Sequence, residues 1–181
     1  MNYKASLDNL AKGITFILFA VLIFLGIKNI ALLFSNTTTL SNIVSHLLIL
    51  LLFVLIVLFS WIFAPVSYTL NDDFFMIRRR ISNISIELES IIKIKLLTEK
   101  EIKGAIRTFG VGGVFGYFGT FYFSKIGSCT VYATQRKNMI LIETKEKKKL
   151  IITPDEIELA TELTEKIKKK IINQENKESA F

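Results

Sequence analysis

The stretch IVSHLLILLLFVLIVLFSWIFA, residues Ile43–Ala64, decides the architecture of this chain because it contains no Asp, Glu, Lys or Arg. The hydrocarbon core of a bilayer is about 30 Å thick, and a helix needs roughly 20 apolar residues to cross it. In water such a helix would have no polar face to turn toward the solvent. We therefore predict a membrane span over about residues 43–64.

A second apolar run, Ile14–Phe34, lies just before it and is interrupted only by Lys28 and Asn29 toward its far end. A lysine in that place can extend its stem to the headgroups, so the run still predicts a span. It is too long for a cleaved signal peptide, and another span follows directly. The two runs together predict a transmembrane hairpin joined by the polar loop Ser35–Asn42.

The basic residues predict the orientation of this hairpin. Lys4 and Lys12 precede the first span, Arg78–Arg80 follow the second, and the loop between the spans is uncharged. By the positive-inside rule, both termini are cytoplasmic. The chain then divides into an N-terminal segment with the hairpin (1–64), a cytoplasmic domain (65–172) and a disordered tail (173–181).

The cytoplasmic domain has the pattern of a mainly antiparallel β domain. Its strand-like segments are bounded by turn residues such as Asn71-Asp72, and no helix separates one strand from the next. The segments Cys129–Thr134 and Met139–Thr144 are expected to form a hairpin across Gln135–Asn138. The predicted strands are Val66–Leu70, Phe74–Arg80, Ile84–Leu88, Ile92–Leu96, Cys129–Thr134, Met139–Thr144 and Leu150–Ile152.

A helix is predicted over Pro154–Ile172. Thr153, Pro154 and Glu156 form the pattern of a capping box with proline in the first turn. One face carries an apolar stripe that must be buried against the sheet. Its members are Ile157, Ala160, Leu163, Ile167 and Ile171, and we expect Leu163 and Ile167 to contact Ile92, Ile94 or Val131.

The segment between the fourth and fifth of these strands carries a family signature, Arg107-Thr-Phe-Gly110-Val-Gly-Gly113-Val-Phe-Gly116-Tyr-Phe-Gly119. It resembles the signature of a bacterial pleckstrin-homology (PH) domain family, and Tyr132-Ala133-Thr134, Leu141-Ile142-Glu143 and Thr153-Pro154 extend the resemblance over roughly Tyr68–Lys170. The resemblance implies a PH-like barrel, often behind two membrane spans of a bacterial inner membrane, and we expect this barrel to be partly open and capped at one end by the C-terminal helix. It implies no catalytic residues.

The glycines and aromatic rings of Phe109–Phe123 allow two interpretations. Their spacing, G-x-G-G-x-x-G, is not that of a dinucleotide-binding loop, and no Walker lysine follows. The glycines can serve tight bends while the rings fill the core, which is the interpretation we favour. Alternatively, the segment is a loop that enters the membrane interface or grips a partner.

Arg78, Arg79 and Arg80 are the predicted headgroup contacts. Their simplest role is to set the topology. If a turn is centred on Asn71–Asp73, however, they pair back toward Pro65, where the second span leaves the bilayer. They would then lie at headgroup height, where each basic residue contributes about 1 kcal/mol toward an anionic leaflet.

The sequence lacks the residues that other classes of function require. His46 and Cys129 are the only residues of their types, which excludes His-based triads and thiolate clusters from the domain. The lysine runs Lys145–Lys149 and Lys166–Lys170 have acidic neighbours, so no nucleic-acid partner is predicted. We predict no enzymatic activity, cofactor or metal.

The sequence thus predicts a membrane-anchored PH-like interaction module whose surface meets anionic lipid headgroups or a membrane protein partner. The alternative is a structural or accessory subunit of an inner-membrane complex, with the transmembrane hairpin as its interface.

Overall fold

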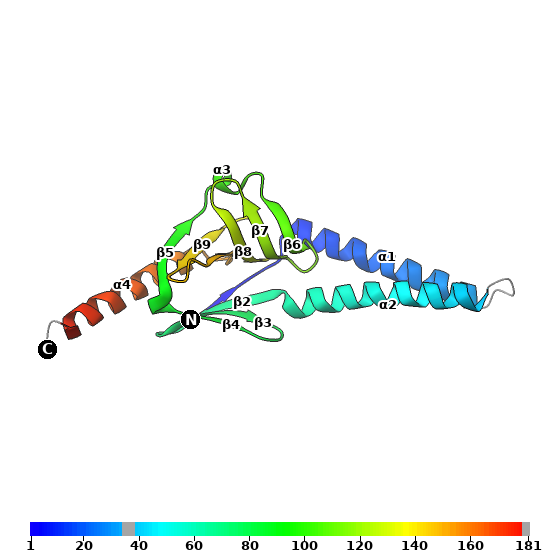
Figure 1. The fold of residues 1–181 in the computed structure, drawn as a ribbon, viewed down its shortest axis with the longest axis horizontal. Coiled ribbons are helices and arrows are strands. Elements are labelled where there is room, and N and C mark those ends of the chain that lie inside the picture. The colour runs from blue at the N-terminus through cyan, green and yellow to red at the C-terminus, as the bar shows by residue number, and fades with distance from the viewer. Residues whose placement is uncertain (34–38, 179–181) are drawn as a thin grey trace.

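The structure, a computed structural model, describes residues 1–33 and 39–178 (Figure 1). Residues 34–38, which make up much of the predicted loop Ser35–Asn42, lie outside the described part, as do residues 179–181 of the predicted tail.

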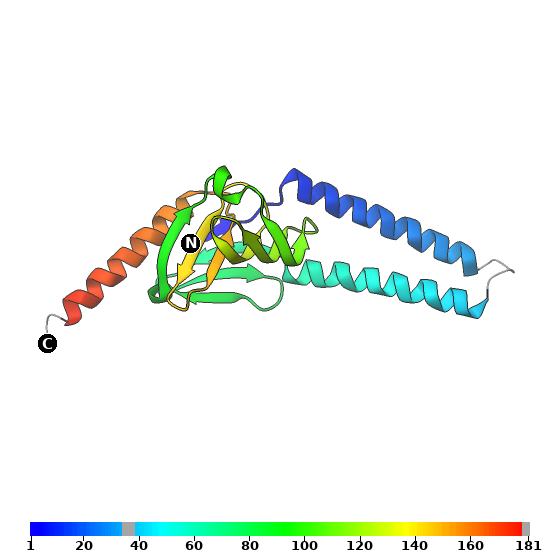
Figure 2. The ribbon, with the colours of Figure 1, turned by 45° about the horizontal axis from the view of Figure 1, so that its top comes forward.

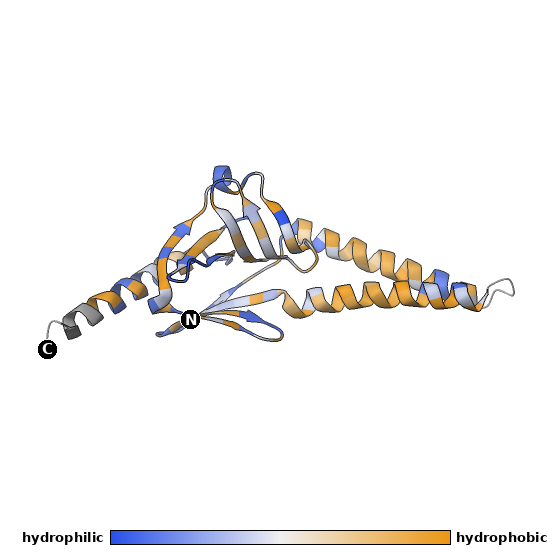
Figure 3. Ribbon diagram, viewed as in Figure 1, coloured by the Kyte–Doolittle hydropathy of each residue, from blue (hydrophilic) through white to orange (hydrophobic). Residues whose placement is uncertain are grey.

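The two predicted spans lie in two long helices, α1 (Asn9–Leu33) and α2 (Leu40–Phe63), that run side by side (Figure 2). Both are long and apolar enough to cross a membrane. In the view of Figure 3 most of their length is coloured as hydrophobic, and very few of their side chains are covered by the rest of the chain. The prediction of a helical hairpin capable of spanning a membrane is confirmed.

The strands form two sheets at the end of the hairpin where α1 begins and α2 ends (Figure 1). Sheet A has the order β1-β2-β3-β4, and sheet B has the order β5-β9-β10-β8-β7-β6. The strands are β1 (Asn2–Lys4), β2 (Pro65–Leu70), β3 (Phe74–Arg79), β4 (Ile84–Glu87), β5 (Ile91–Leu96), β6 (Ile106–Gly112), β7 (Tyr117–Phe123), β8 (Gly127–Ala133), β9 (Ile140–Thr144) and β10 (Lys149–Ile152).

A PH-like, mainly antiparallel domain is confirmed, and its two sheets are not closed into a complete barrel, as the prediction of a partly open barrel requires. β4 is short and ends in a single 3-10 turn, η1 (Leu88–Ser90), that leads directly into β5 of the other sheet. The outer edge of β4 therefore has no neighbouring strand in the described part of the chain.

The predicted hairpin across Gln135–Asn138 is wrong, because β10 lies between β8 and β9 and pairs with β8 in parallel. The side chains of Gln135 and Asn138 donate to the carbonyl of Pro154, at 3.0 and 3.3 Å. These bonds tie the β8–β9 connection to the segment after β10. The connection thus crosses the end of β10 instead of forming a tight turn.

One buried hydroxyl joins the two sheets. Tyr68 of β2 donates to the carbonyl of Tyr132 in β8 at 2.7 Å and accepts the amide of Thr153 at 3.1 Å. Its complete burial raises the pKa of the phenol to about 12, so the hydroxyl keeps its proton at neutral pH. Apolar side chains from both sheets surround it.

The C-terminal helix, α4, covers the main core but begins later than predicted, at Glu158, and continues through Glu178 into the predicted tail. The capping box fails because the Thr153 hydroxyl accepts the amide of Thr134 at 3.0 Å instead. Leu163 is fully buried in the same cluster as Ile94 and Ile167, as predicted. Val131 belongs to the cluster on the other side of sheet B, so that expected contact is wrong.

A short helix, α3 (Glu99–Ile102), carries a capping box formed by Thr98 and Glu101.

The buried face of α4 gives the first prediction. Leu163→Asp would bury an unpaired charge, so we expect the melting temperature of the purified full chain to fall by at least about 10 °C. Ile172→Asp, on the exposed part of the same helix, is the matched control and should melt like the wild type. Equal melting of the wild type and both variants would show that α4 is not docked.

Candidate functional site at the junction of helices and sheets

The strand register returns the predicted arginines to the end of α2. β3 runs antiparallel to β2, and Arg79 pairs with Pro65, the residue after the helix cap Ala64. Arg78 pairs with Ser67 across a bulge. Because the connection between β2 and β3 is short, Arg79 lies beside the residue that follows α2.

Arg79 and Arg80 lie against the aromatic end of α2. The guanidinium of Arg80 is 4.4 Å from the centroid of the Trp61 ring, and it donates to the Trp61 carbonyl at 2.8 Å. Carbonyls in the last turn of a helix have no partner within the helix, so this bond satisfies one of them. Arg79 lies 5.4 Å from the centroid of Phe63 and donates to the carbonyl of Ser82.

The three arginines are not equivalent. Burial lowers the pKa of the Arg80 guanidinium, yet an arginine pKa is so high that the group stays charged. Arg78 lies on the outer face of sheet A, where its Nε donates to the hydroxyl of Thr69 at 3.1 Å. The structure thus brings Arg79 and Arg80 together with α2 and turns Arg78 away from it.

The signature glycines shape the hairpin of β6 and β7. Gly110 and Gly119 face one another across the two strands, with φ of 110° and 123°. A Cβ on Gly110 would come within 2.8 Å of the Gly119 Cα, so the strands can approach this closely only without side chains. Gly116 likewise leaves room for the carbonyl of Ala133.

The aromatic residues of this hairpin divide between core and surface. Phe118 and Phe123 are buried, while Phe109 is 78% exposed and Tyr122 is 48% exposed. Arg107 is exposed, with its guanidinium beside Gly112. The favoured structural interpretation therefore accounts for the glycines and for some of the rings, but not for Phe109.

The tip of the hairpin contacts α1. The amide of Phe115 donates to the Thr15 hydroxyl at 3.0 Å, and the Phe115 ring meets Phe19 edge to face at a centroid distance of 6.1 Å. Gly113 lies directly against the side chain of Ile14. These contacts were not predicted, because no local pattern relates Thr15 to a residue so far along the chain.

Asp8 joins the start of α1 to sheet B. Its carboxylate accepts the amide of Ala11 at 2.7 Å, as a helix N-cap does, and also the Tyr117 hydroxyl at 3.1 Å and Arg136 Nε at 3.0 Å. Burial alone would raise the pKa of Asp8, but these three hydrogen bonds outweigh it and hold the pKa below its ordinary value. An Asp directly before an apolar helix is a recognisable N-cap signal, which sequence analysis passed over.

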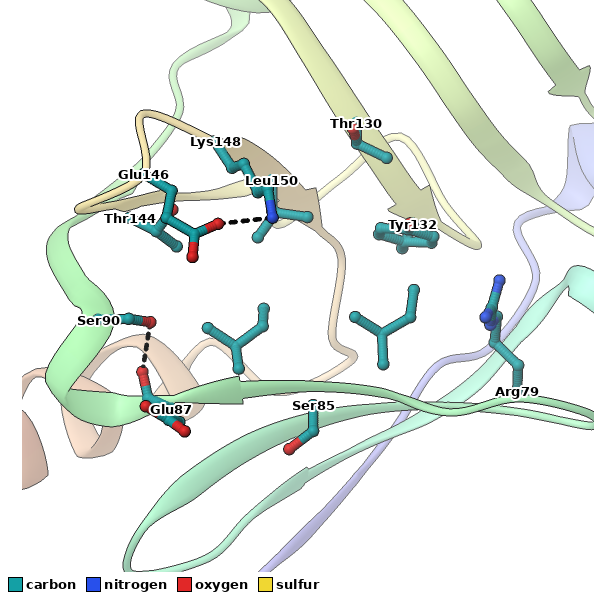
Figure 4. Close-up of a pocket in the computed structure, with 12 residues that line it drawn as sticks. Arg79, Ser85, Glu87, Ser90, Thr130, Tyr132, Thr144, Glu146, Lys148 and Leu150 are labelled. Atoms are coloured by element: carbon teal, nitrogen blue, oxygen red, sulfur yellow. Dashed lines mark hydrogen bonds and ion pairs between the residues drawn. The ribbon is translucent and has the colours of Figure 1, made fainter.

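A cleft of about 640 Å³ opens between the sheets, where a closed barrel would have a wall. Figure 4 shows Arg79 at one end, Glu146 and Lys148 at the other, and Ser85 and Glu87 across from Thr130 and Tyr132. Thr144 also lines it, and its buried hydroxyl has no hydrogen-bond partner among the described residues. The volume is that of a small-ligand or peptide-segment site.

The lowered pKa of Asp8 gives the second prediction. A depressed carboxyl pKa adds stability that is complete above the unfolded value of about 4 and is lost as the pH falls through the folded value. Asp8→Asn should destabilise the full chain by about 1 kcal/mol at pH 7. The melting temperatures of variant and wild type should converge as the pH is lowered below about 4. A difference that stays constant down to acid pH would contradict this role of the carboxylate.

Comparison with known families agrees with this architecture. Residues 66–171, from β2 into α4, match the family described as the bacterial PH domain. No curated protein and no solved structure shows a significant match. Since the match covers more than half of the chain, this protein belongs to the bacterial PH domain family.

Proposed function

We propose that this protein is a non-enzymatic, membrane-anchored interaction module that binds anionic lipid headgroups at the cytoplasmic face of the bacterial inner membrane. The observation that carries the proposal is the packing of Arg80 on Trp61 and of Arg79 near Phe63. Tryptophan and arginine at the end of an apolar helix are residues typical of the membrane–water interface. The two cations are held at the point where α2 leaves the bilayer.

The topology of the proposal has two supports. Lys4, Lys12 and Arg78–Arg80 all lie beside the helix ends that meet the sheets. In addition, β1 and β2 are neighbours in sheet A, although α1 and α2 separate them in the chain. A strand before the hairpin can pair with a strand after it only if both are on one side of the membrane. We take that side to be the cytoplasm.

The expected binding free energy is that of a weak contact, which is sufficient because the domain is tethered to the membrane. Each arginine near an anionic leaflet contributes about 1 kcal/mol, too little for three of them to hold a soluble domain firmly. The helical hairpin keeps the domain beside the lipid, which raises the effective concentration of headgroups. A modest preference for anionic lipid is then sufficient to fill the site.

Recognition of a protein segment is a second candidate function, favoured by the cleft. The amide of Leu88 donates to the carbonyl of Asp73 at 3.0 Å, and antiparallel ladders alternate, so Ser85 and Glu87 point their backbone groups away from β3. Both residues border the cleft, and the backbone groups of Ser85 and the amide of Glu87 could pair with an extended segment, while the Glu87 carbonyl already accepts the Ser90 hydroxyl at 2.7 Å. The unpartnered Thr144 hydroxyl would supply a further bond.

The third prediction tests the headgroup proposal with the full chain in mixed nanodiscs of phosphatidylglycerol and phosphatidylcholine. Native mass spectrometry of the released protein counts the lipids that stay bound. We expect the wild type to retain phosphatidylglycerol in preference, and increasingly less so as the salt concentration rises, because salt screens exposed charges. Arg78→Gln, Arg79→Gln and Arg80→Gln combined should remove most of this preference while the protein stays folded.

The matched control is Lys145→Gln, Lys147→Gln and Lys148→Gln combined, which changes the net charge equally at the β9–β10 turn. This variant should keep the preference. If both variants lost the preference for phosphatidylglycerol equally, the net charge of the protein alone would explain it. A wild type without any preference for phosphatidylglycerol would overturn the headgroup proposal and favour the protein-segment function.

A further inference from the structure

We infer that the tip of the β6–β7 hairpin, residues 113–116, is inserted into the interfacial layer of the bilayer that α1 spans. The partner is the lipid itself. The tip contacts it beside α1 and gives the domain a second, apolar contact with the membrane. The inference rests on the part of the proposed function that places α1 in a membrane. It does not depend on headgroup binding by Arg78–Arg80.

The depth of the tip follows from its contacts with α1. The apolar run of this helix begins at Ile14, and the tip meets Ile14, Thr15 and Phe19. At a rise of 1.5 Å per residue, Phe19 lies about 7 Å beyond the start of the run. Because the Phe115 ring packs on Phe19, it lies at the same depth as lipid-facing residues of α1. Figure 1 shows the hairpin reaching past the first turn of the helix.

The backbone of the tip suits a region with little water, where an unpaired amide is costly. The amide of Gly113 donates to the carbonyl of Gly116 at 2.8 Å, and the amide of Phe115 donates to Thr15 at 3.0 Å. Thr15 in turn donates its hydroxyl proton to the carbonyl of Ala11 at 2.7 Å. The turn is thus completed by a side chain of the membrane helix.

The side chains around the tip have the polarity order of a membrane interface. The tip itself, Gly-Val-Phe-Gly, has no charged or hydrogen-bonding side chain. The Arg107 guanidinium lies beside Gly112, one residue before the tip, where it can meet phosphates. Phe109, 78% exposed, extends the apolar surface along β6, the edge strand of sheet B. Aromatic rings and arginine stems favour this layer.

Phe115 supports the same conclusion through its backbone. It adopts φ of 54°, which a bulky non-glycine residue rarely occupies. Glycine would relieve this strain, and the tip already has glycine on either side of Val114-Phe115. The ring at this position is therefore accounted for by what it contacts, namely Phe19 and, in our inference, the acyl chains next to it.

The test is the fourth prediction and measures depth directly. Val114→Cys, in a Cys129→Ala background, is labelled with the fluorophore NBD, and the full chain is reconstituted into phosphatidylcholine vesicles. The control is Lys125→Cys in the β7–β8 turn, at the opposite end of β7. Lipids with a nitroxide near the headgroup end of the acyl chain should quench the label at position 114 several times more strongly than at 125. Iodide in the buffer should do the reverse.

Equal quenching by the lipid nitroxide at both positions overturns the inference. So does a label at 114 that neither quencher reaches, because a protein partner or a second copy then covers the tip. Melting curves of both labelled proteins confirm that they are folded. Phosphatidylcholine is uncharged overall, so strong quenching at 114 would stand even if the arginines showed no preference for anionic lipid.

Discussion

The chain enters the β domain from the membrane at two separate points, and this double attachment is the constraint on which the arrangement depends. α2 runs without a linker into β2, since Ala64 is the helix cap and Pro65 the first strand residue. Before α1, residues 1–8 run back into the domain. Their ends are fixed by the N-terminal ammonium on the carbonyl of Leu70 at 2.8 Å and by Asp8 on Arg136 and Tyr117. A domain held at both points cannot rotate freely on its anchor.

This attachment also unites the two sheets and α4. β1 extends sheet A, Tyr3 donates its hydroxyl to Glu162 of α4, and Ser6 binds the carboxylate of Asp155 at 2.9 Å through its amide. Tyr68 joins sheet A to sheet B from within. The same geometry brings the arginines and the β6–β7 tip to the side of the domain where both helices begin or end. The cationic and the apolar lipid contacts that we propose would both follow from this attachment of the domain to its two helices.

The sequence predicted the features that local patterns encode. Two uninterrupted apolar runs give α1 and α2, and alternating residues give most strands of both sheets, with ends close to those observed. β1 was missed because three residues carry no periodicity, and its pairing with β2 is set by the membrane hairpin between them. β6 and β7 were missed because glycines and aromatic residues obscure the alternation there. The parallel β8–β10 pair was not predicted, because it arises from long-range contacts. The predicted capping box fails for a related reason, because the backbone of β8 competes for the hydroxyl of Thr153. At the site, the strand pairing of the arginines and the N-cap role of Asp8 were predictable from local patterns, whereas the contacts of Asp8 with Tyr117 and Arg136, those of Thr15, and the cleft required the fold.

Attachment at both points should give the domain one fixed orientation on its two helices. The distance between spin labels at Ile17 of α1 and Lys125 of the β7–β8 turn, measured by pulsed electron paramagnetic resonance on the full chain with Cys129→Ala in lipid bilayers, tests it most directly. A single narrow distance distribution is the predicted result. A broad distribution would show that the domain moves on the end of α2 and is not held by its second attachment through residues 1–8.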